Sequence, residues 1–253
     1  DPIHAVLLGQ AEGALKDVSQ DTGLALLYDD WGAPMLAWGS AMLDLDRDGR
    51  LDLVMAHGDD GSRFEEPPED APPMFATAHL NRGDLSFVDA TEALGLGRRG
   101  RWRALAVGDP DRDGDPDLVI GGVGELPRVY RNAIETPHKG FSLRLRGSVS
   151  NHLGVGALIE VEGPGLVTQR HYVGGVASPN VVSAPVVFIG LGGATGPVTT
   201  RVHWPSGIVQ EVVDLPSGTR HVLEEPGRLA LYPAGRHLPA DGVSTFKVDL
   251  SPP

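Results

Sequence analysis

The chain of 253 residues contains no cysteine and no apolar run that approaches the length of a membrane span. The lack of cysteine excludes disulfide bridges, thiol nucleophiles and thiolate metal ligands. A transmembrane helix needs about 20 predominantly apolar residues, so the sequence predicts no membrane span. The N-terminal residues also lack the basic and apolar segments of a secretory signal peptide, and we expect that such a peptide has been removed.

Motifs for common enzyme chemistries are also missing. No histidine pair has the H-E-x-x-H spacing of a zinc site, and no glycine-rich segment has the P-loop or dinucleotide-binding pattern before a helix. Ser206 lies in Trp-Pro-Ser-Gly, which lacks the first glycine of the G-x-S-x-G motif. The sequence therefore favours a non-catalytic protein, with a polar site at His57 and Asp59, beside a strand end, as the alternative.

Positive charge is in deficit, since 21 Lys and Arg residues stand against 34 Asp and Glu residues. The formal net charge of −13 argues against a nucleic-acid partner, because proteins of that class carry a basic field. One local exception is the segment 98–103, in which four arginines surround Trp102. This arginine cluster permits three readings: contact with a protein or an anionic glycan, packing of Trp102 between repeats, or an ordinary exposed loop.

What the sequence does contain is a pair of acidic loops with the same spacing. Residues 44–52 and 109–117 both read D-x-D-x-D-G-x-x-D, and each runs directly into an apolar strand. Alternate carboxylates on a tightly curled loop direct their oxygens toward one centre, and the glycine permits the turn. A hard cation with about six to eight oxygen ligands suits such a centre, and Ca²⁺ suits it best.

The twelfth loop position distinguishes these loops from an EF-hand, because it holds Met55 or Ile120 instead of a bidentate glutamate. We therefore predict two Ca²⁺ sites of a β-protein type, in which the ninth-position aspartates replace that glutamate. The alternative is a solvated acidic turn without a metal. The candidate metal ligands are Asp44, Asp46, Asp48, Arg50 and Asp52 in the first loop and Asp109, Asp111, Asp113, Asp115 and Asp117 in the second.

The acidic loops belong to an internal repeat. Residues 17–24 return in similar form as residues 89–96, and each copy precedes one of the loops. A third lead-in begins at residues 129–132, after the strand that follows the second loop. Units of short strands separated by Gly and Asp turns cannot bury their apolar faces alone, so we expect them to stack as in a solenoid or propeller.

With these loops and the lead-in at 81–87, the chain resembles the FG-GAP/VCBS repeats, the blades of integrin-type β-propellers. Through segments 151–157, 188–192 and 202–207, the following region resembles the ASPIC/UnbV domain of cartilage acidic protein and of many bacterial secreted proteins. The resemblance implies an all-β fold of propeller blades, here an incomplete propeller, followed by a β-sandwich-like domain. It also implies stabilisation by calcium outside the cell, and it implies no known reaction.

We predict calcium-binding repeats at 1–138, an ASPIC/UnbV-like β-domain at 139–227 and a C-terminal tail at 228–253. The tail holds one candidate strand at 244–250, which either packs on its own domain or pairs with another chain. No segment has the pattern of an amphipathic helix. Alternation of apolar and polar residues predicts strands at 141–146, 157–162, 168–173, 186–191, 200–204, 208–213 and 220–223.

A propeller closes with about four to eight blades, whereas the sequence supplies two clear repeats. Three explanations are open: degenerate blades of this chain complete the ring, other chains complete it, or the chain is a processed piece of a longer protein. Because exposed blade edges invite association, we expect another protein chain, identical or different, as partner, and a glycan as a further candidate ligand.

The absence of disulfides favours a bacterial protein that is secreted, periplasmic or on the cell surface. The leading hypothesis is a non-catalytic, calcium-stabilised interaction module that forms part of a larger assembly. The alternative is a subunit of a carbohydrate-active hydrolase or lyase with a site on the propeller, which rests on fold analogy.

Overall fold

The computed structural model describes residues 7–9, 14–24, 35–58, 74–84, 86–174, 177–178, 181–227 and 246–247. Nearly all regular structure in these ranges is β-strand, and the helix that they contain is a single turn, α1 (Ser19–Thr22). The predicted all-β fold class is therefore confirmed. In the same ranges, no helix is long and apolar enough to cross a membrane.

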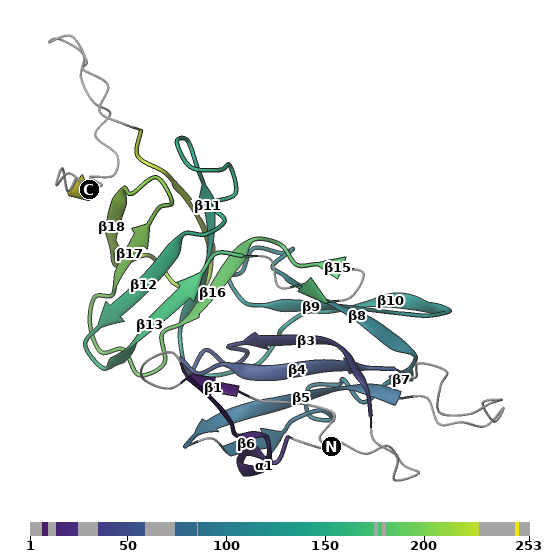
Figure 1. Cartoon of the computed structure of the whole chain (residues 1–253). Helices are drawn as coiled ribbons and strands as arrows, with labels where there is room; N and C mark the ends of the chain where they lie inside the picture. Colours follow the sequence, from purple (N-terminus) through teal and green to yellow (C-terminus); the bar gives the residue numbers. More distant parts are fainter. Residues whose placement is uncertain are drawn as a thin grey trace, which may run out of the picture.

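The N-terminal half contains two stacked antiparallel sheets, which we call the first and second repeat sheets (Figure 1). The first consists, in spatial order, of β3 (Ala37–Leu43), β4 (Asp52–His57), β5 (Met74–Gly83) and β6 (Ser86–Asp89). The second consists of β10 (Glu125–Tyr130), β9 (Asp117–Gly122) and β8 (Trp102–Gly108). A hairpin of β1 (Leu7–Gly9) and β2 (Leu15–Asp17) precedes them, and β7 (Arg99–Gly100) pairs with β5.

The two repeat sheets bury a common apolar core. Val54 on β4, Leu105 on β8 and Ile120 on β9 are almost completely excluded from solvent. Trp102, at the start of β8, joins the same cluster. Stacking therefore buries faces that neither sheet would bury alone, as the sequence repeat predicts.

The second repeat sheet has the same strand pairing as the first sheet as far as the third strand. Leu53 pairs with His79 between β4 and β5, and Leu118 pairs with Tyr130 between β9 and β10. Strand β10 therefore corresponds to β5. The residues predicted to begin a third repeat, 129–132, are the end of β10 and the start of the connection to the next domain.

The two sheets differ after this third strand. Gly83 and Asp84 adopt φ of 84° and 47° at the end of β5, and this turn brings the chain back as β6. Ile134 occupies the place that corresponds to Gly83, and a β-branched residue disfavours positive φ. The chain continues away from the sheet, so β10 is an edge strand within the described ranges.

The C-terminal domain contains two further sheets. The three-stranded sheet consists of β16 (Val186–Gly190), β11 (Gly140–Arg146) and β19 (Arg220–Glu224). The five-stranded sheet consists of β13 (Leu166–Tyr172), β12 (Leu158–Gly163), β17 (Thr199–His203), β18 (Val209–Val213) and β20 (Phe246–Lys247). The seven strands predicted for this domain are confirmed, with ends that differ by one or two residues.

The two sheets of the C-terminal domain pack face to face. Phe141 and Leu143 on β11 share a buried cluster with Ile159 on β12 and Val202 on β17. This common core makes the domain sandwich-like, as predicted. The two described residues of the tail, β20, pair with β18, so this part of the tail lies on its own domain.

Glu225 anchors the end of this domain. Its buried carboxylate accepts hydrogen bonds from the N–H groups of Ser148, Val149 and Ser150 at 2.7–2.8 Å, and from the Ser206 hydroxyl at 2.5 Å. Burial alone would raise the pKa of Glu225, but these donors hold it at about 2. Ser206 of the Trp-Pro-Ser-Gly segment is therefore engaged in a structural hydrogen bond.

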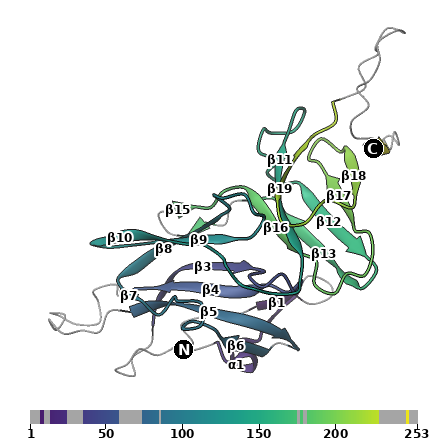
Figure 2. The ribbon, with the colours of Figure 1, turned by 180° about the vertical axis from the view of Figure 1, so that it is seen from behind.

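The C-terminal domain lies at the end of the repeat sheets that carries the acidic loops (Figures 1 and 2). A short hairpin, β14 (Ala177–Ser178) and β15 (Val181–Val182), extends from it against β8. The backbone just after this hairpin is also hydrogen-bonded to the second repeat sheet, because the N–H of Ala184 donates to the carbonyl of Val107 at 3.2 Å. Both acidic loops are thereby placed at the junction of the two domains.

Candidate metal centre

The first acidic loop connects β3 to β4, and the second connects β8 to β9. Arg47 and Gly49 adopt φ of 62° and 89° in the first loop, and Arg112 and Gly114 adopt 64° and 94° in the second. Left-handed backbone at the fourth and sixth positions curls each loop tightly. The shared sequence pattern therefore produces a shared backbone geometry.

The first loop gathers three of its predicted ligands. Asp44, Asp46 and Asp48 each bring one carboxylate oxygen to within 4.8 Å of the others. The Oδ2 atom of Asp44 accepts the N–H of Gly49 at 2.8 Å, whereas its buried Oδ1 atom has no hydrogen-bond partner among the described residues. A buried carboxylate oxygen without a donor is costly, and a bound cation would satisfy it.

The second loop gathers Asp109, Asp111 and Asp117 in the same way, again with one oxygen from each within 4.8 Å of the others. Here two buried oxygens, Oδ1 of Asp109 and Oδ2 of Asp117, have no hydrogen-bond partner in the part of the chain that is described. Asp113 is not one of these three, but its carboxylate is close enough to interact electrostatically with Asp111 and Asp109, and it stays a predicted ligand of the second site. Among the described residues, the second loop thus contains more buried carboxylate oxygens without a hydrogen-bond partner than the first.

The ninth-position aspartates brace their loops. Asp52 accepts the N–H of Leu45 and the N–H of Asn81, both at 2.8 Å, so each of its oxygens has a donor. Asp117 accepts the corresponding N–H of Asn132 at 2.7 Å, and its Oδ2 atom has no donor among the described residues. Asp117 therefore joins the cluster of its loop, whereas Asp52 serves mainly to fix the first loop to β5.

The seventh positions, Arg50 and Asp115, have their side chains in ion pairs. The guanidinium of Arg50 lies 2.8 Å from Asp48, and the carboxylate of Asp115 pairs with Arg47 of the first loop. With their side chains engaged, these two positions would bind a metal through their main-chain carbonyls, as the seventh position of an EF-hand does. The pair between Arg47 and Asp115 also joins the two loops to each other.

The electrostatics of the loops favour a bound cation. Burial, aided by the carboxylates of Asp52, Asp48 and Asp46, raises the pKa of Asp44 to about 7 against the opposing hydrogen bond from the N–H of Gly49. Burial likewise raises the pKa of Asp52 and of Asp117 to about 6. Clustered carboxylates that resist ionisation are stabilised by a divalent ion, which supplies the missing positive charge. Both loops therefore fit a hard cation with oxygen ligands.

Sequence patterns did not predict that two residues of the C-terminal domain reach the second loop. Ser142 on β11 and Arg220 on β19 donate hydrogen bonds to Oδ2 of Asp109, at 2.7 Å and 3.2 Å. They lie 33 and 111 positions from Asp109 in the chain and belong to no motif. Only the folded structure brings them together.

The fold divides the arginine cluster. Trp102 is 1% exposed, belongs to the core of the repeat sheets and donates its indole N–H to the carbonyl of Arg98 at 3.0 Å. The guanidinium of Arg103 lies over the ring of Trp38, 4.2 Å from its centroid. Of the three readings, packing of Trp102 between the repeats is the one that the structure shows, and a buried indole has no face on which a glycan can stack.

The alternative polar site at His57 and Asp59 is not accessible at His57. This side chain has no exposed surface, and its Nε2 atom lies 3.0 Å from the hydroxyl of Thr77 within the first repeat sheet. Asp59 lies outside the described residues. What the structure describes of this pair is therefore a buried strand residue.

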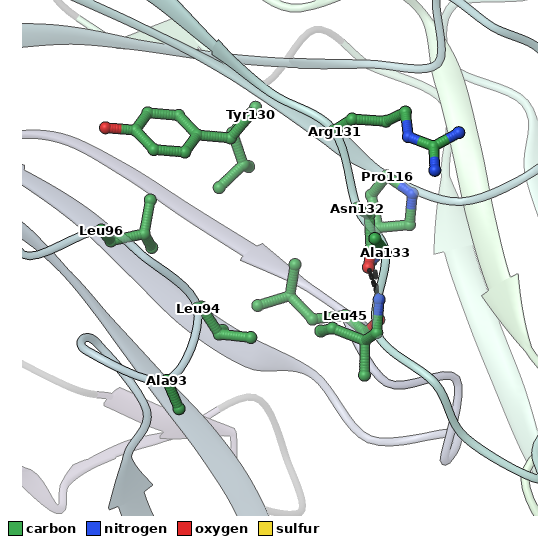
Figure 3. A pocket seen from close by; sticks show the side chains of 11 residues that line it. Leu45, Ala93, Leu94, Leu96, Pro116, Tyr130, Arg131, Asn132 and Ala133 are labelled. Atoms are coloured by element: carbon green, nitrogen blue, oxygen red, sulfur yellow. Dashed lines mark hydrogen bonds between the residues drawn. The ribbon is translucent and has the colours of Figure 1, made fainter.

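A cavity of about 340 Å³ opens between the repeat sheets beside both loops (Figure 3). Leu45 of the first loop, Leu94, Leu96 and Tyr130 give it an apolar lining. Arg131 at its rim is the only charged residue among the described residues that line it. This lining suits an apolar side chain and presents no group of titratable residues.

Two protein-family models match the chain. Residues 44–120 match the model of an FG-GAP-like repeat, and residues 147–230 match the model of the ASPIC and UnbV domain. The first match contains both acidic loops, and the second contains most strands of the C-terminal domain. No curated protein matches the chain.

Proposed function

The chain combines an FG-GAP-like repeat with an ASPIC/UnbV domain, and we propose that it is a calcium-stabilised, non-catalytic interaction module. This pair of domains is typical of repeat or interaction modules, and FG-GAP repeat proteins are commonly extracellular. We therefore propose a site of action outside the cytoplasm, in a secreted, periplasmic or surface-bound form. The absence of cysteine supports calcium rather than disulfides as the stabilising link.

One observation carries the calcium assignment. Within the described residues, both carboxylate clusters contain buried oxygens without a hydrogen-bond donor, on Asp44 in the first loop and on Asp109 and Asp117 in the second. Carboxylate and carbonyl oxygens on a curled loop are the ligands that Ca²⁺ prefers. The ion supplies charge neutralisation, while the loop residues hold their oxygens in place. We infer two Ca²⁺ ions per chain.

The interaction surface that we propose is the edge of β10. In the first repeat sheet β6 covers the corresponding edge of β5, whereas β10 has no such neighbour in the described ranges. Leu126 and Val129 on β10 are 82% and 67% exposed, which is a large apolar exposure for an edge strand. A partner chain would add a strand there, as β6 does within this chain, and would pair beyond Pro127, which has no N–H to donate.

Native mass spectrometry before and after chelation tests both parts of the proposal. We expect two Ca²⁺ per chain, lost with EDTA, and a stable homo-oligomer or a co-purifying protein. Replacement of Val129 by Lys should dissociate that complex, whereas Val167→Lys, an exposed valine on the edge strand β13, should not. A monomer without calcium would contradict the proposal. A calcium-bearing monomer would support the proposed metal sites and would contradict the proposed interface at β10.

A further inference from the structure

The carboxylate of Asp109 connects the second acidic loop to the C-terminal domain. Its residue is 2% exposed, and its two oxygens have different surroundings. Oδ2 accepts hydrogen bonds from the Ser142 hydroxyl at 2.7 Å and from Arg220 Nε at 3.2 Å. Oδ1 is buried without a hydrogen-bond partner in the described ranges, and the Asp109 carboxylate belongs to the cluster with Asp111 and Asp117. Asp109 therefore takes part in the carboxylate cluster of the second loop and also binds two residues of the C-terminal domain.

The two donors form a prepared site on the C-terminal domain. Ser142 and Arg220 are paired neighbours on the parallel strands β11 and β19, and the N–H of Ser142 donates to the carbonyl of Thr219 at 3.2 Å. Both therefore approach Asp109 from a rigid sheet instead of a loop. Because two donors from fixed strands hold Oδ2, the orientation of the carboxylate is fixed, and the position of Oδ1 is fixed with it.

The backbone of the same loop packs against the same strand. A side chain at Gly114 would place its Cβ atom 2.8 Å from the carbonyl oxygen of Thr219 and 2.9 Å from its nitrogen. Gly114 also has φ of 94°, so glycine is required there twice, for the turn and for the contact. The loop and the start of β19 therefore lie in direct backbone contact.

The corresponding residue of the first loop is held differently. Oδ2 of Asp44 accepts the N–H of Gly49 at 2.8 Å, a donor from the same loop. The C-terminal domain does touch the first loop, since the N–H of Gly192 donates to the carbonyl of Arg47 at 2.9 Å and Gly190 packs against the Asp44 carboxylate, but within the described residues it donates no hydrogen bond to that carboxylate. The first loop orients its leading carboxylate internally, whereas the second depends on another domain to do so.

From these contacts we propose that Ser142 and Arg220 are positioning residues of the second calcium site, so that this site is complete only when the C-terminal domain is docked. By the reciprocity of binding free energies, calcium in the second loop then strengthens the docking of the C-terminal domain. The first site lacks this dependence. This inference rests on the proposed calcium function, and it adds residues outside both acidic loops.

Calcium titration calorimetry on the full chain tests the proposal in two backgrounds. Asp48→Ala removes the first site and leaves the second, whereas Asp113→Ala removes the second and leaves the first. In the Asp48→Ala background, we expect Arg220→Ala and Ser142→Ala each to weaken calcium binding about 10- to 100-fold, the usual cost of losing a residue that orients a metal ligand. In the Asp113→Ala background, neither replacement should change the affinity more than about twofold.

The sign of the Arg220 effect is diagnostic. If Arg220 acted only through its charge, its removal would take a cation away from a cation site and would tighten binding. Weaker binding therefore requires the positioning role. Arg201→Ala is the matched control, because Arg201 is on the same domain and pairs with Glu162 and Glu211, away from the loops. It should leave both affinities unchanged.

Trypsin cleavage of the connection between the domains gives a second readout. Lys139, which precedes β11, is exposed, and calcium should slow cleavage there in the Asp48→Ala protein but not when Arg220→Ala is added. Normal affinity of the first site in Asp113→Ala/Arg220→Ala shows that this variant folds. Unchanged or tighter binding at the second site would overturn the inference while the calcium function stands. A wild-type chain that binds no calcium would overturn both.

Discussion

The two acidic loops have the same sequence pattern and the same left-handed positions, yet their surroundings differ. The first loop supplies its own donor to Asp44 and pairs Asp48 with Arg50. The second takes the donors for Asp109 from the C-terminal domain and keeps more buried oxygens without partners. Repetition of a sequence therefore copies the backbone of a site, while the tertiary contacts decide what each copy is connected to.

Removal of calcium from both loops should have the largest effect. A ligand at about 100 times its dissociation constant stabilises a protein by about 2.7 kcal/mol per site. For a chain of this size, about 1 kcal/mol shifts the melting temperature by about 2–4 °C, so EDTA should lower it by roughly 10–20 °C. Differential scanning calorimetry with and without chelator measures this. An unchanged melting temperature would show that neither loop is a metal site.

Loss of a single ligand should divide that effect between the loops. Asp48→Ala and Asp113→Ala should each remove about half of the stabilisation by calcium, because each abolishes one site. In EDTA, Asp113→Ala should be neutral or slightly stabilising, since it relieves repulsion within the cluster. Asp48→Ala should cost up to about 1 kcal/mol there, through its half-exposed pair with Arg50.

The control for this pair of variants is Asp21→Ala, an exposed carboxylate outside both loops that pairs with Lys16. It should behave identically with and without calcium. If Asp48→Ala or Asp113→Ala lost as much stability in chelator as in calcium, the residue would have a structural role and the ligand assignment at that loop would be wrong.

The sequence was sufficient to predict the local parts of the fold. The D-x-D-x-D-G-x-x-D spacing located both loops, because four or five carboxylates with a glycine turn inside nine consecutive residues are typical of one tightly curled loop. Alternation along 141–146 located β11, because the side chains of a strand alternate between its faces. The end of the second repeat sheet was harder to predict, since residues 129–132 read as the start of a third repeat, whereas they end β10 and begin the connection to the next domain.

The parts of the site that could not be predicted connect residues far apart in the chain. Arg47 pairs with Asp115 across 68 positions, and Asp109 meets Arg220 across 111. No periodicity relates such pairs, because they depend on how whole sheets pack. The same reason explains Trp102: its flanking arginines suggested a surface, whereas the stacking of the sheets encloses it.

Replacement of Gly190 tests the contact of the C-terminal domain with the first loop. A Cβ atom at this position would overlap Oδ2 of Asp44 and lie 2.7 Å from Cα of Arg47. Gly190→Ala should therefore destabilise the protein by about 1–3 kcal/mol, the usual cost of overpacking. Urea unfolding measures this. Gly174→Ala is the control, because a Cβ atom there meets no atom within 4 Å, and equal losses in both variants would refute the contact.

The smallest expected effect is a pH dependence of the chelated protein. The ordinary pKa of an aspartate is 3.8, and burial raises that of Asp44 to about 7. Between these values the folded state binds more protons than the unfolded state, so stability that is present below pH 3.8 is lost as the pH rises through 7. In EDTA, the free energy of unfolding should therefore fall by about 1–2 kcal/mol from pH 5 to pH 7.5. In Asp44→Asn, whose amide does not ionise, urea unfolding should show a smaller decrease over this interval. Parallel decreases in the two proteins would exclude Asp44 as the source of the pH dependence.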